Sequence, residues 1–253
     1  TYGASAVTSN DAPMRIGIPD EAFGSGLDPL IRERILQLAE DVAQAGHQLV
    51  PVSLPHSRFA VACYYILATA EASSNLARYD GIRYGARHGR IAGAEAGIGQ
   101  TGTQEHEDGL AAMYERTRSQ GFGLEVKRRI LLGTYVLSKG YYDAYYAKAQ
   151  KVRRLIQQDF LKAFEQVDVI LTPSTPTTAF RIGEMESDPL AMYLQDIYTL
   201  PANLAGICAI SLPAGRDIEH MPFGMQLQAA PFAEPTLIQA AAEFEAAASP
   251  ASN

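Results

Sequence analysis

The most regular pattern of apolar and polar positions lies in the middle of the chain, between Gly140 and Pro176. Apolar side chains recur there every three or four residues, and polar side chains fill the positions between them. This spacing predicts a long amphipathic helix that packs on a sheet, with its tyrosines in the core. The predicted stripe consists of Tyr142, Tyr145, Tyr146, Ala149, Val152, Leu155, Ile156, Phe160, Ala163, Phe164 and Val167.

A short apolar run, Val169–Leu171, follows this helix and is closed by Thr172 and Pro173. It is too short for a helix and too apolar for an edge strand, so it predicts an interior strand of a parallel-rich sheet. Ligands of open α/β sheets bind in the loops that follow the carboxyl ends of such strands.

A strand-helix-strand unit is predicted before this segment. Met14–Pro19 is expected to form one strand and His47–Leu54 another. The helix between them begins after Asp28, which is expected to cap it, has proline at its first position, and ends before Gly46. We expect the two strands to be parallel and the crossover to be right-handed.

The remaining elements complete an α/β pattern. Helices are expected at Ser57–Arg78, Gln104–Ser119, Gly123–Leu137, Pro189–Leu200 and Pro235–Ala247. Ala209–Pro213 and Phe223–Gln228 are expected to form an antiparallel pair of strands. The predicted fold class is α/β, with a mixed, mostly parallel sheet covered by helices on both faces.

Two stretches lack this regularity. Residues 1–13 are rich in Ser, Ala, Asn and Pro, and we expect a linker from a missing amino-terminal half. The glycine-rich stretch at about 85–104 is expected to be a mobile, exposed insertion. It contains Gly97–Gly102, which matches G-x-G-x-x-G, but it lacks the preceding strand that a dinucleotide-binding loop requires.

Composition and charge narrow the class of protein. The 253 residues, 47% hydrophobic and 19% charged, suffice for a globular core. A net charge of -7 argues against a nucleic-acid surface, because phosphate contacts need clustered Lys and Arg. Neither a membrane-spanning run nor a signal peptide is apparent, and Cys63 and Cys208 have no zinc or disulfide spacing. We therefore expect a cytoplasmic protein.

No familiar catalytic or metal-binding motif is apparent. The sequence lacks G-x-S-x-G, H-E-x-x-H, a P-loop and C-x-x-C. We expect no metal site. The histidines are scattered, and each is expected to be a surface or turn residue: His47, His56, His88, His106 and His220.

Several long strings resemble the A subunits of aspartyl/glutamyl-tRNA amidotransferases, a group within the amidase signature family. They are Tyr64–Gly85 (YYILATAEASSNLARYDGIRYG), Gly121–Gly133 (GFGLEVKRRILLG), Gly140–Arg153 (GYYDAYYAKAQKVR), Asp188–Thr199 (DPLAMYLQDIYT) and Pro201–Gly206 (PANLAG). The resemblance covers the carboxyl half of that family. It implies that residues 14–253 are the carboxyl-terminal part of a single amidase domain.

The resemblance implies a glutaminase that serves protein biosynthesis. In the family, a serine attacks the side-chain amide of glutamine and ammonia is released. A second type of subunit, called B, then uses ATP, Mg²⁺ and this ammonia to convert Glu-tRNA(Gln) or Asp-tRNA(Asn) to Gln-tRNA(Gln) or Asn-tRNA(Asn). The implied assembly is a heterotrimer with amidotransferase subunits B and C, in which B makes the main contacts to tRNA and this chain carries no cofactor.

The catalytic residues of the family do not transfer to this sequence. Its nucleophilic serine, its bridging serine in a cis peptide and its lysine base lie in a Gly/Ser-rich amino half. Here no lysine precedes such a segment, and Ala72-Ser73-Ser74 lies within a predicted helix. We therefore expect the chain to be inactive by itself.

Three residues match family positions that contact the bound glutamine: Tyr64, Arg129 and Asp196. Arg129 is expected to hold the α-carboxylate, because a guanidinium binds a carboxylate bidentately. Asp196 is expected to hold the α-ammonium, and Tyr64 to add a hydroxyl or a ring wall, which would position the distant amide. Without the resemblance, Arg129 is interpreted as part of a solvated basic helix face, Asp196 as an ordinary acidic residue of a helix, and Tyr64 as a core residue.

Two alternative functions remain open. One is a stand-alone amidase of the same superfamily, but a neutral amide needs no clamp for a zwitterion such as Arg129 and Asp196. The other is a non-catalytic amino-acid-binding or assembly module, which would bind glutamine without releasing ammonia. Cys208 also departs from the family, which usually has proline there.

Overall fold

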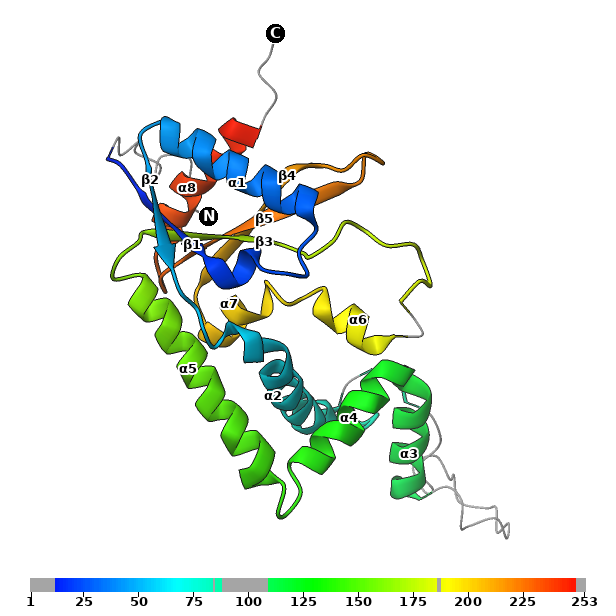
Figure 1. Ribbon diagram of the computed structural model, residues 1–253. Coiled ribbons are helices and arrows are strands. Elements are labelled where there is room, and N and C mark those ends of the chain that lie inside the picture. Colours follow the sequence, from blue (N-terminus) through cyan, green and yellow to red (C-terminus); the bar gives the residue numbers. More distant parts are fainter. Residues whose placement is uncertain (1–11, 84, 88–108, 186–187, 249–253) are drawn as a thin grey trace, which may run out of the picture. The chain divides into compact units, whose positions relative to one another are not determined.

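The computed structural model describes residues 12–83, 85–87, 109–185 and 188–248. The chain divides into two compact units (Figure 1). The sheet unit comprises Thr1–Tyr64 and Gln150–Asn253, and the helical unit comprises Tyr65–Ala149. The segment Gly97–Gly102, His88 and His106 lie outside the described residues, as do most of the predicted linker and of the glycine-rich insertion.

Five strands form the sheet of the sheet unit, in the order β2-β1-β3-β5-β4. Their bounds are β1 Arg15–Pro19, β2 Gln48–Val52, β3 Val169–Pro173, β4 Cys208–Arg216 and β5 Pro222–Ala229. β1 is parallel to both β2 and β3, whereas β5 is antiparallel to both β3 and β4. The predicted mixed sheet is confirmed, and β3 is its central strand with all five residues buried.

Helices α1 (Pro29–Gln44) and α8 (Glu234–Ala248) cover one face of the sheet (Figure 1). As predicted, the Asp28 side chain caps α1, accepting a hydrogen bond from the Leu30 N–H at 2.8 Å. The core that these helices share with β3 and β5 includes the fully buried Ile31, Ile35, Leu38, Leu171, Met225, Leu227 and Phe244.

The opposite face is covered by α5 (Ala147–Ala163) and α7 (Leu200–Ala205) (Figure 1). The connection after α5 packs closely on β1, because a Cβ added at Gly17 would lie 3.0 Å from Val167 of this connection. Helices on both faces account for the complete burial of β3.

The segment Pro189–Leu200, predicted as one helix, contains one short helix and the first residue of a second helix. Helix α6 covers Pro189–Leu194, a turn follows, and α7 begins at Leu200. Pro201 lies in the first turn of α7. Proline is well accepted there, because its missing N–H has no partner in the first turn, so Pro201 begins a helix rather than ending one.

The helical unit contains α3 (Leu110–Gly121), α4 (Leu124–Val136) and most of α2 (Ala60–Asn75). α2 lies between two short 3-10 helices, η3 (Ser57–Phe59) and η4 (Leu76–Arg78). α2 and α4 approach backbone to backbone, because a Cβ added at Gly133 would lie only 1.9 Å from the carbonyl oxygen of Thr69. Only glycine fits at this position of α4.

The central amphipathic helix begins with a π-helical turn, η5 (Tyr142–Tyr146), and continues as α5. The predicted stripe is buried at Ile156 and Phe160, but Tyr142 and Tyr145 are 46% and 41% exposed. The prediction of a tyrosine core is therefore wrong for these two side chains. The tyrosine rings pack on one another instead: the centroids of Tyr142 and Tyr146 are 5.2 Å apart, and those of Tyr141 and Tyr145 are 5.9 Å apart.

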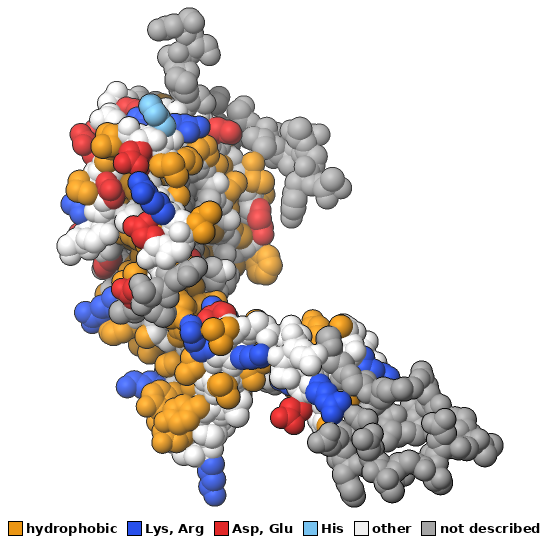
Figure 2. All heavy atoms as spheres, turned by 90° about the vertical axis from the view of Figure 1, so that its right-hand side faces the viewer, with side chains coloured by type: hydrophobic (Ala, Val, Ile, Leu, Met, Phe, Trp, Pro, Cys, Tyr) orange, Lys and Arg blue, Asp and Glu red, His pale blue; other side chains and the backbone are white. Residues whose placement is uncertain are grey.

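Charged side chains of both signs are interspersed on the face shown in Figure 2. Within the described residues, no helix is both long enough and apolar enough to cross a membrane.

Candidate functional site

The three predicted glutamine contacts are distributed over both units. Tyr64 lies in the second turn of α2 and is half-buried, and Asp196 lies exposed in the turn between α6 and α7. Both belong to the sheet unit. Arg129 lies in α4 of the helical unit, and 30% of its side chain is exposed.

Asp196 is held by its backbone, and its side chain lies at the surface. Its carbonyl oxygen accepts hydrogen bonds from the N–H groups of Thr199 at 3.1 Å and of Leu200 at 3.0 Å. These bonds connect Asp196 directly to the first residue of α7. The Asp196 carboxylate therefore projects from a turn that is hydrogen-bonded to the start of α7.

Arg129 is oriented by its own helix. Its Nε donates to Oε1 of Glu125 at 2.9 Å, while Oε2 of Glu125 binds Arg128 at 3.0 Å. The Arg129 guanidinium carbon lies 5.9 Å from the centroid of the Tyr65 ring. Surface pairs at this helical spacing contribute only about 0.5 kcal/mol, so Glu125 can orient Arg129 without excluding a ligand carboxylate.

A pocket of about 150 Å³ lies at the carboxyl ends of the parallel strands. Pro19 at the end of β1, Leu54 after β2 and Thr172 near the end of β3 all line it. The chain passes from β1 to β2 on one side of β1 and later returns to β3 on its other side, and the pocket lies at this reversal of strand order, the usual ligand position in open α/β sheets. Ile197 and Tyr198, the residues that follow Asp196, form another part of its wall.

The pocket also has polar groups that can hydrogen-bond to a ligand. Burial raises the pKa of the Tyr198 phenol, although the nearby Arg32 partly offsets this, so the hydroxyl keeps its proton at neutral pH. The buried amide of Gln228 donates to Thr172 Oγ1 at 3.3 Å and also to Gln226. Tyr198 and the Gln228–Thr172 pair therefore give a largely apolar pocket a few fixed donors and acceptors.

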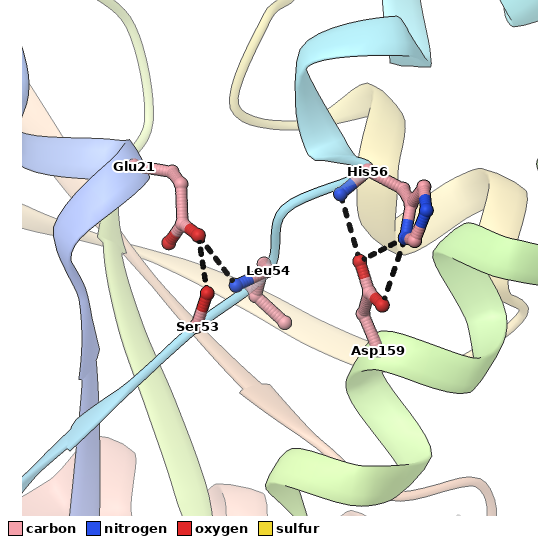
Figure 3. Close-up of polar contacts among 5 residues, drawn as sticks. All are labelled: Glu21, Ser53, Leu54, His56 and Asp159. Carbon is pink, nitrogen blue, oxygen red and sulfur yellow. Dashed lines mark hydrogen bonds and ion pairs between the residues drawn. The ribbon is translucent and has the colours of Figure 1, made fainter.

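Two carboxylates hold the connection between β2 and α2 (Figure 3). Glu21 Oε1 accepts hydrogen bonds from Ser53 Oγ at 2.6 Å and from the Leu54 N–H at 3.0 Å. Asp159 Oδ2 accepts from the His56 N–H at 2.8 Å, and both its oxygens lie 3.0 Å from His56 Nδ1. His56 is thus a turn residue, as predicted, but one with a buried partner on α5.

Sequence reasoning missed these carboxylates, although one of them leaves a signal. Asp159 stands between Ile156 and Phe160 on the apolar stripe of α5 and is only 8% exposed. A carboxylate on a buried helix face needs hydrogen-bond donors, so its position predicts a partner. Glu21 lies in a short 3-10 helix, η2 (Asp20–Phe23), after β1 and carries no comparable signal.

Metal binding finds no support in the part of the chain that the structure describes. No group of three or more His, Cys, Asp or Glu side chains there is placed to hold a metal ion. The contacts of the His56–Asp159 pair join the connection before α2 to α5.

Comparison with known proteins defines the class to which this fold and site belong. The family model described as "Amidase" matches residues 2–238. The chain therefore belongs to the amidase family.

Within this family the chain is similar to proteins named as the A subunits of glutamyl-tRNA(Gln) amidotransferases. It is 52% identical over 244 residues to the one from Geobacter metallireducens, an alignment that covers 96% of this chain and 47% of the relative. The corresponding protein from Geotalea daltonii is 54% identical over 241 residues, with coverage of 95% and 46%. The chain thus spans about half the length of the curated relatives that it matches.

Solved structures give the same result for the fold. The crystal structure of the glutamyl-tRNA(Gln) amidotransferase A subunit from Thermotoga maritima has a TM-score of 0.62 at 35% identity, covering 89% of this chain and 40% of that one. A 6-aminohexanoate cyclic dimer hydrolase has a TM-score of 0.71 at 19% identity, covering 97% and 47%, and shares the fold alone. The family resemblance and the fold class expected from the sequence are confirmed.

Proposed function

We propose that this chain is the glutamine-binding half of the glutaminase subunit of a tRNA-dependent amidotransferase. The observation that carries the proposal is the 52% identity, over 96% of this chain, to a relative named as the A subunit of such an enzyme. In the proposed reaction, glutamine is hydrolysed to glutamate and ammonia, and partner subunits B and C complete the assembly. The B subunit uses the ammonia, with ATP and Mg²⁺, to amidate Glu-tRNA(Gln) or Asp-tRNA(Asn) in the cytoplasm.

The residues of this chain bind and orient the amino acid. Arg129 binds the α-carboxylate and Asp196 the α-ammonium, because a zwitterion needs one partner of each charge. Tyr64 supplies a hydroxyl or a ring wall. The exposure of the Asp196 side chain supports its role, and the Arg129–Glu125 pair supports the role of Arg129, since a surface ion pair costs little to exchange for a ligand.

The bond-breaking groups are proposed to lie in the amino half of the family, outside this chain. There a serine attacks the amide carbon, the carbon–nitrogen bond breaks, and the nitrogen takes up a proton and leaves as ammonia; water then hydrolyses the acyl-serine ester and releases glutamate. Fixing both charged ends of glutamine brings its amide to that serine in one orientation, which is how binding residues contribute to rate. This division of roles leaves the chain inactive by itself.

The test uses the complete natural protein that contains this sequence, assembled with its partners, and measures ammonia released from glutamine and from propionamide. The proposal predicts rapid release from glutamine and little from propionamide, which has no charged ends. Faster release from propionamide would indicate a stand-alone amidase for neutral amides. Binding of glutamine without ammonia release would indicate a binding module.

A further inference from the structure

We propose that three polar side chains of α5, Arg153, Gln157 and Asp159, are positioning residues for the glutamine site. Asp159 supports the helix that carries Tyr64, and the other two support the helix that begins after the Asp196 turn. This inference rests on the proposed function, because it assigns a role to the scaffold of that same site.

The link from Asp159 to Tyr64 runs through His56. Asp159 is buried, and it binds both the backbone N–H and the ring of His56 (Figure 3). His56 directly precedes η3, which continues into α2. Tyr64 follows eight residues later, about 12–14 Å along a helical path. The hydrogen bonds to Asp159 therefore fix the end of the helix from which Tyr64 projects.

Two further contacts restrain the position of the N-terminal end of α2. Glu21 binds Ser53 and Leu54, which lie just ahead of Pro55 and His56, so carboxylates from two different elements hold one short connection. Arg153 lies beside the Cys63 thiol, the neighbour of Tyr64 in the sequence, and lowers a thiol pKa that burial raises. α5 thus contacts the start of α2 both before Tyr64 and next to it.

The link from α5 to Asp196 runs through α7. Arg153 Nε donates to the Leu204 carbonyl at 2.9 Å, and Gln157 Nε2 donates to the Ala205 carbonyl at 3.0 Å. These are carbonyls of the last turn of α7, which have no partners within the helix. At the other end of α7, the Leu200 N–H binds the Asp196 carbonyl. A helix of six residues is too short to be stable alone, so its position depends on these bonds.

One helix therefore supports both proposed glutamine contacts of the sheet unit. A binding geometry must be held within a fraction of an ångström to align the amide for attack. If α5 provides this support, its side chains act on glutamine without touching it. Their loss should alter the kinetics of glutamine hydrolysis more than it alters folding.

The first experiment compares two adjacent glutamines of α5 in the complete, assembled protein. Gln157 binds α7, whereas the side chain of Gln158 is half-buried and makes no hydrogen bond to another described residue. Gln157→Ala removes the hydrogen bond to α7 and an exposed one from Arg154, and the loss of the first is expected to raise the KM for glutamine about threefold to tenfold, whereas Gln158→Ala is expected to raise it less than about twofold. Equal effects of the two substitutions would overturn the inference.

A double-mutant cycle tests whether Gln157 acts through Asp196. In an Asp196→Asn background, Gln157→Ala is expected to change KM by less than about twofold, because the contact that it supports is already weakened. An undiminished effect in that background would contradict the proposal.

Asp159 is tested by truncation and rescue. Asp159→Ala is expected to raise the glutamine KM, and Asp159→Asn, which keeps an acceptor for the His56 N–H, is expected to restore most of the loss. Failure of Asn to rescue a folded protein would overturn this half of the inference. If the Ala variant does not fold, Asp159→Asn is compared with wild type, and a change of more than about threefold in KM would contradict the proposed geometry.

Substitution of the contacts themselves separates the two levels of proposal. If Tyr64→Phe and Asp196→Asn leave the glutamine KM unchanged, the site assignment fails, and the role of α5 fails with it. If they raise KM while Gln157→Ala and Asp159→Ala do not, the proposed function stands and only the positioning role is overturned.

Discussion

The carboxylate of Asp168 accepts hydrogen bonds from three nitrogen atoms of Arg15. Asp168 Oδ2 accepts hydrogen bonds from the Arg15 backbone N–H at 2.8 Å and from its Nε at 3.3 Å, and Oδ1 accepts from Nη2 at 2.8 Å. The Asp168 N–H in turn donates to the Arg15 carbonyl at 2.9 Å. Because Asp168 precedes β3 and Arg15 begins β1, the pair fixes how the central parallel strands start.

This pair should make stability depend on pH in the acid range. The Arg15 hydrogen bond holds the pKa of Asp168 below its ordinary value, against an opposing effect of burial. A carboxylate with a lowered pKa stabilises the fold fully above its unfolded pKa of about 4, and this contribution is lost as pH falls through the lower folded value. Asp168→Asn is expected to cost about 1–2 kcal/mol at pH 7.

Urea denaturation of both proteins between pH 7 and pH 3 provides the measurement. The difference in unfolding free energy between wild type and Asp168→Asn is expected to shrink below about pH 4. There the wild-type carboxylate becomes protonated and, like the asparagine amide, carries no charge. A difference that stays constant down to pH 3 would show that Asp168 does not carry this dependence.

Gly133 is expected to tolerate no larger residue. A Cβ there would lie 1.9 Å from the Thr69 carbonyl oxygen, so α2 and α4 would have to separate. Gly133→Ala is expected to destabilise the protein by about 3 kcal/mol, in spite of the better helix propensity of alanine. Gly121→Ala at the end of α3 is the matched control, because nothing lies within 4 Å of its added Cβ. Equal melting temperatures for the two variants would contradict the close approach of the two helices.

The two cysteines are expected to differ in reactivity. Burial raises the pKa of Cys63 to about 11, so almost none of it is thiolate at pH 8, and its sulfur is also shielded from solvent. Iodoacetamide at pH 8 should label the half-buried Cys208 first and reach Cys63 only after denaturation. Mass spectrometry of the peptides checks the order, and labelling of Cys63 in the native protein would show that α2 opens locally.

Local patterns predicted most of the secondary structure because they act over a few residues. The Asp28 cap, the apolar run of β3 and the antiparallel pair of β4 and β5 each follow from neighbouring side chains. Pro201 shows where such reasoning fails, since proline can either end a helix or occupy its first turn. The exposed tyrosines show a second failure, because spacing reveals a shared face but not what covers it.

The candidate site was less accessible from the sequence alone. Tyr64, Arg129 and Asp196 were selected by family resemblance, and their local patterns are equally compatible with ordinary structural roles. The support from α5 joins residues about a hundred positions apart, such as His56 and Asp159, and only the fold brings them together. Asp159, a carboxylate on the apolar face of a helix, is a sequence signal for a buried partner that sequence reasoning missed.

The KM for glutamine in an Arg129→Ala variant of the complete, assembled protein tests the central claim most directly. Arg128→Ala is the matched control, because both arginines pair with Glu125 and stand side by side on α4. Loss of a charge-assisted pair costs about 3 kcal/mol, so Arg129→Ala should raise KM about a hundredfold, and Arg128→Ala less than about threefold. An unchanged KM in Arg129→Ala would remove Arg129 from the glutamine site and contradict the zwitterion clamp.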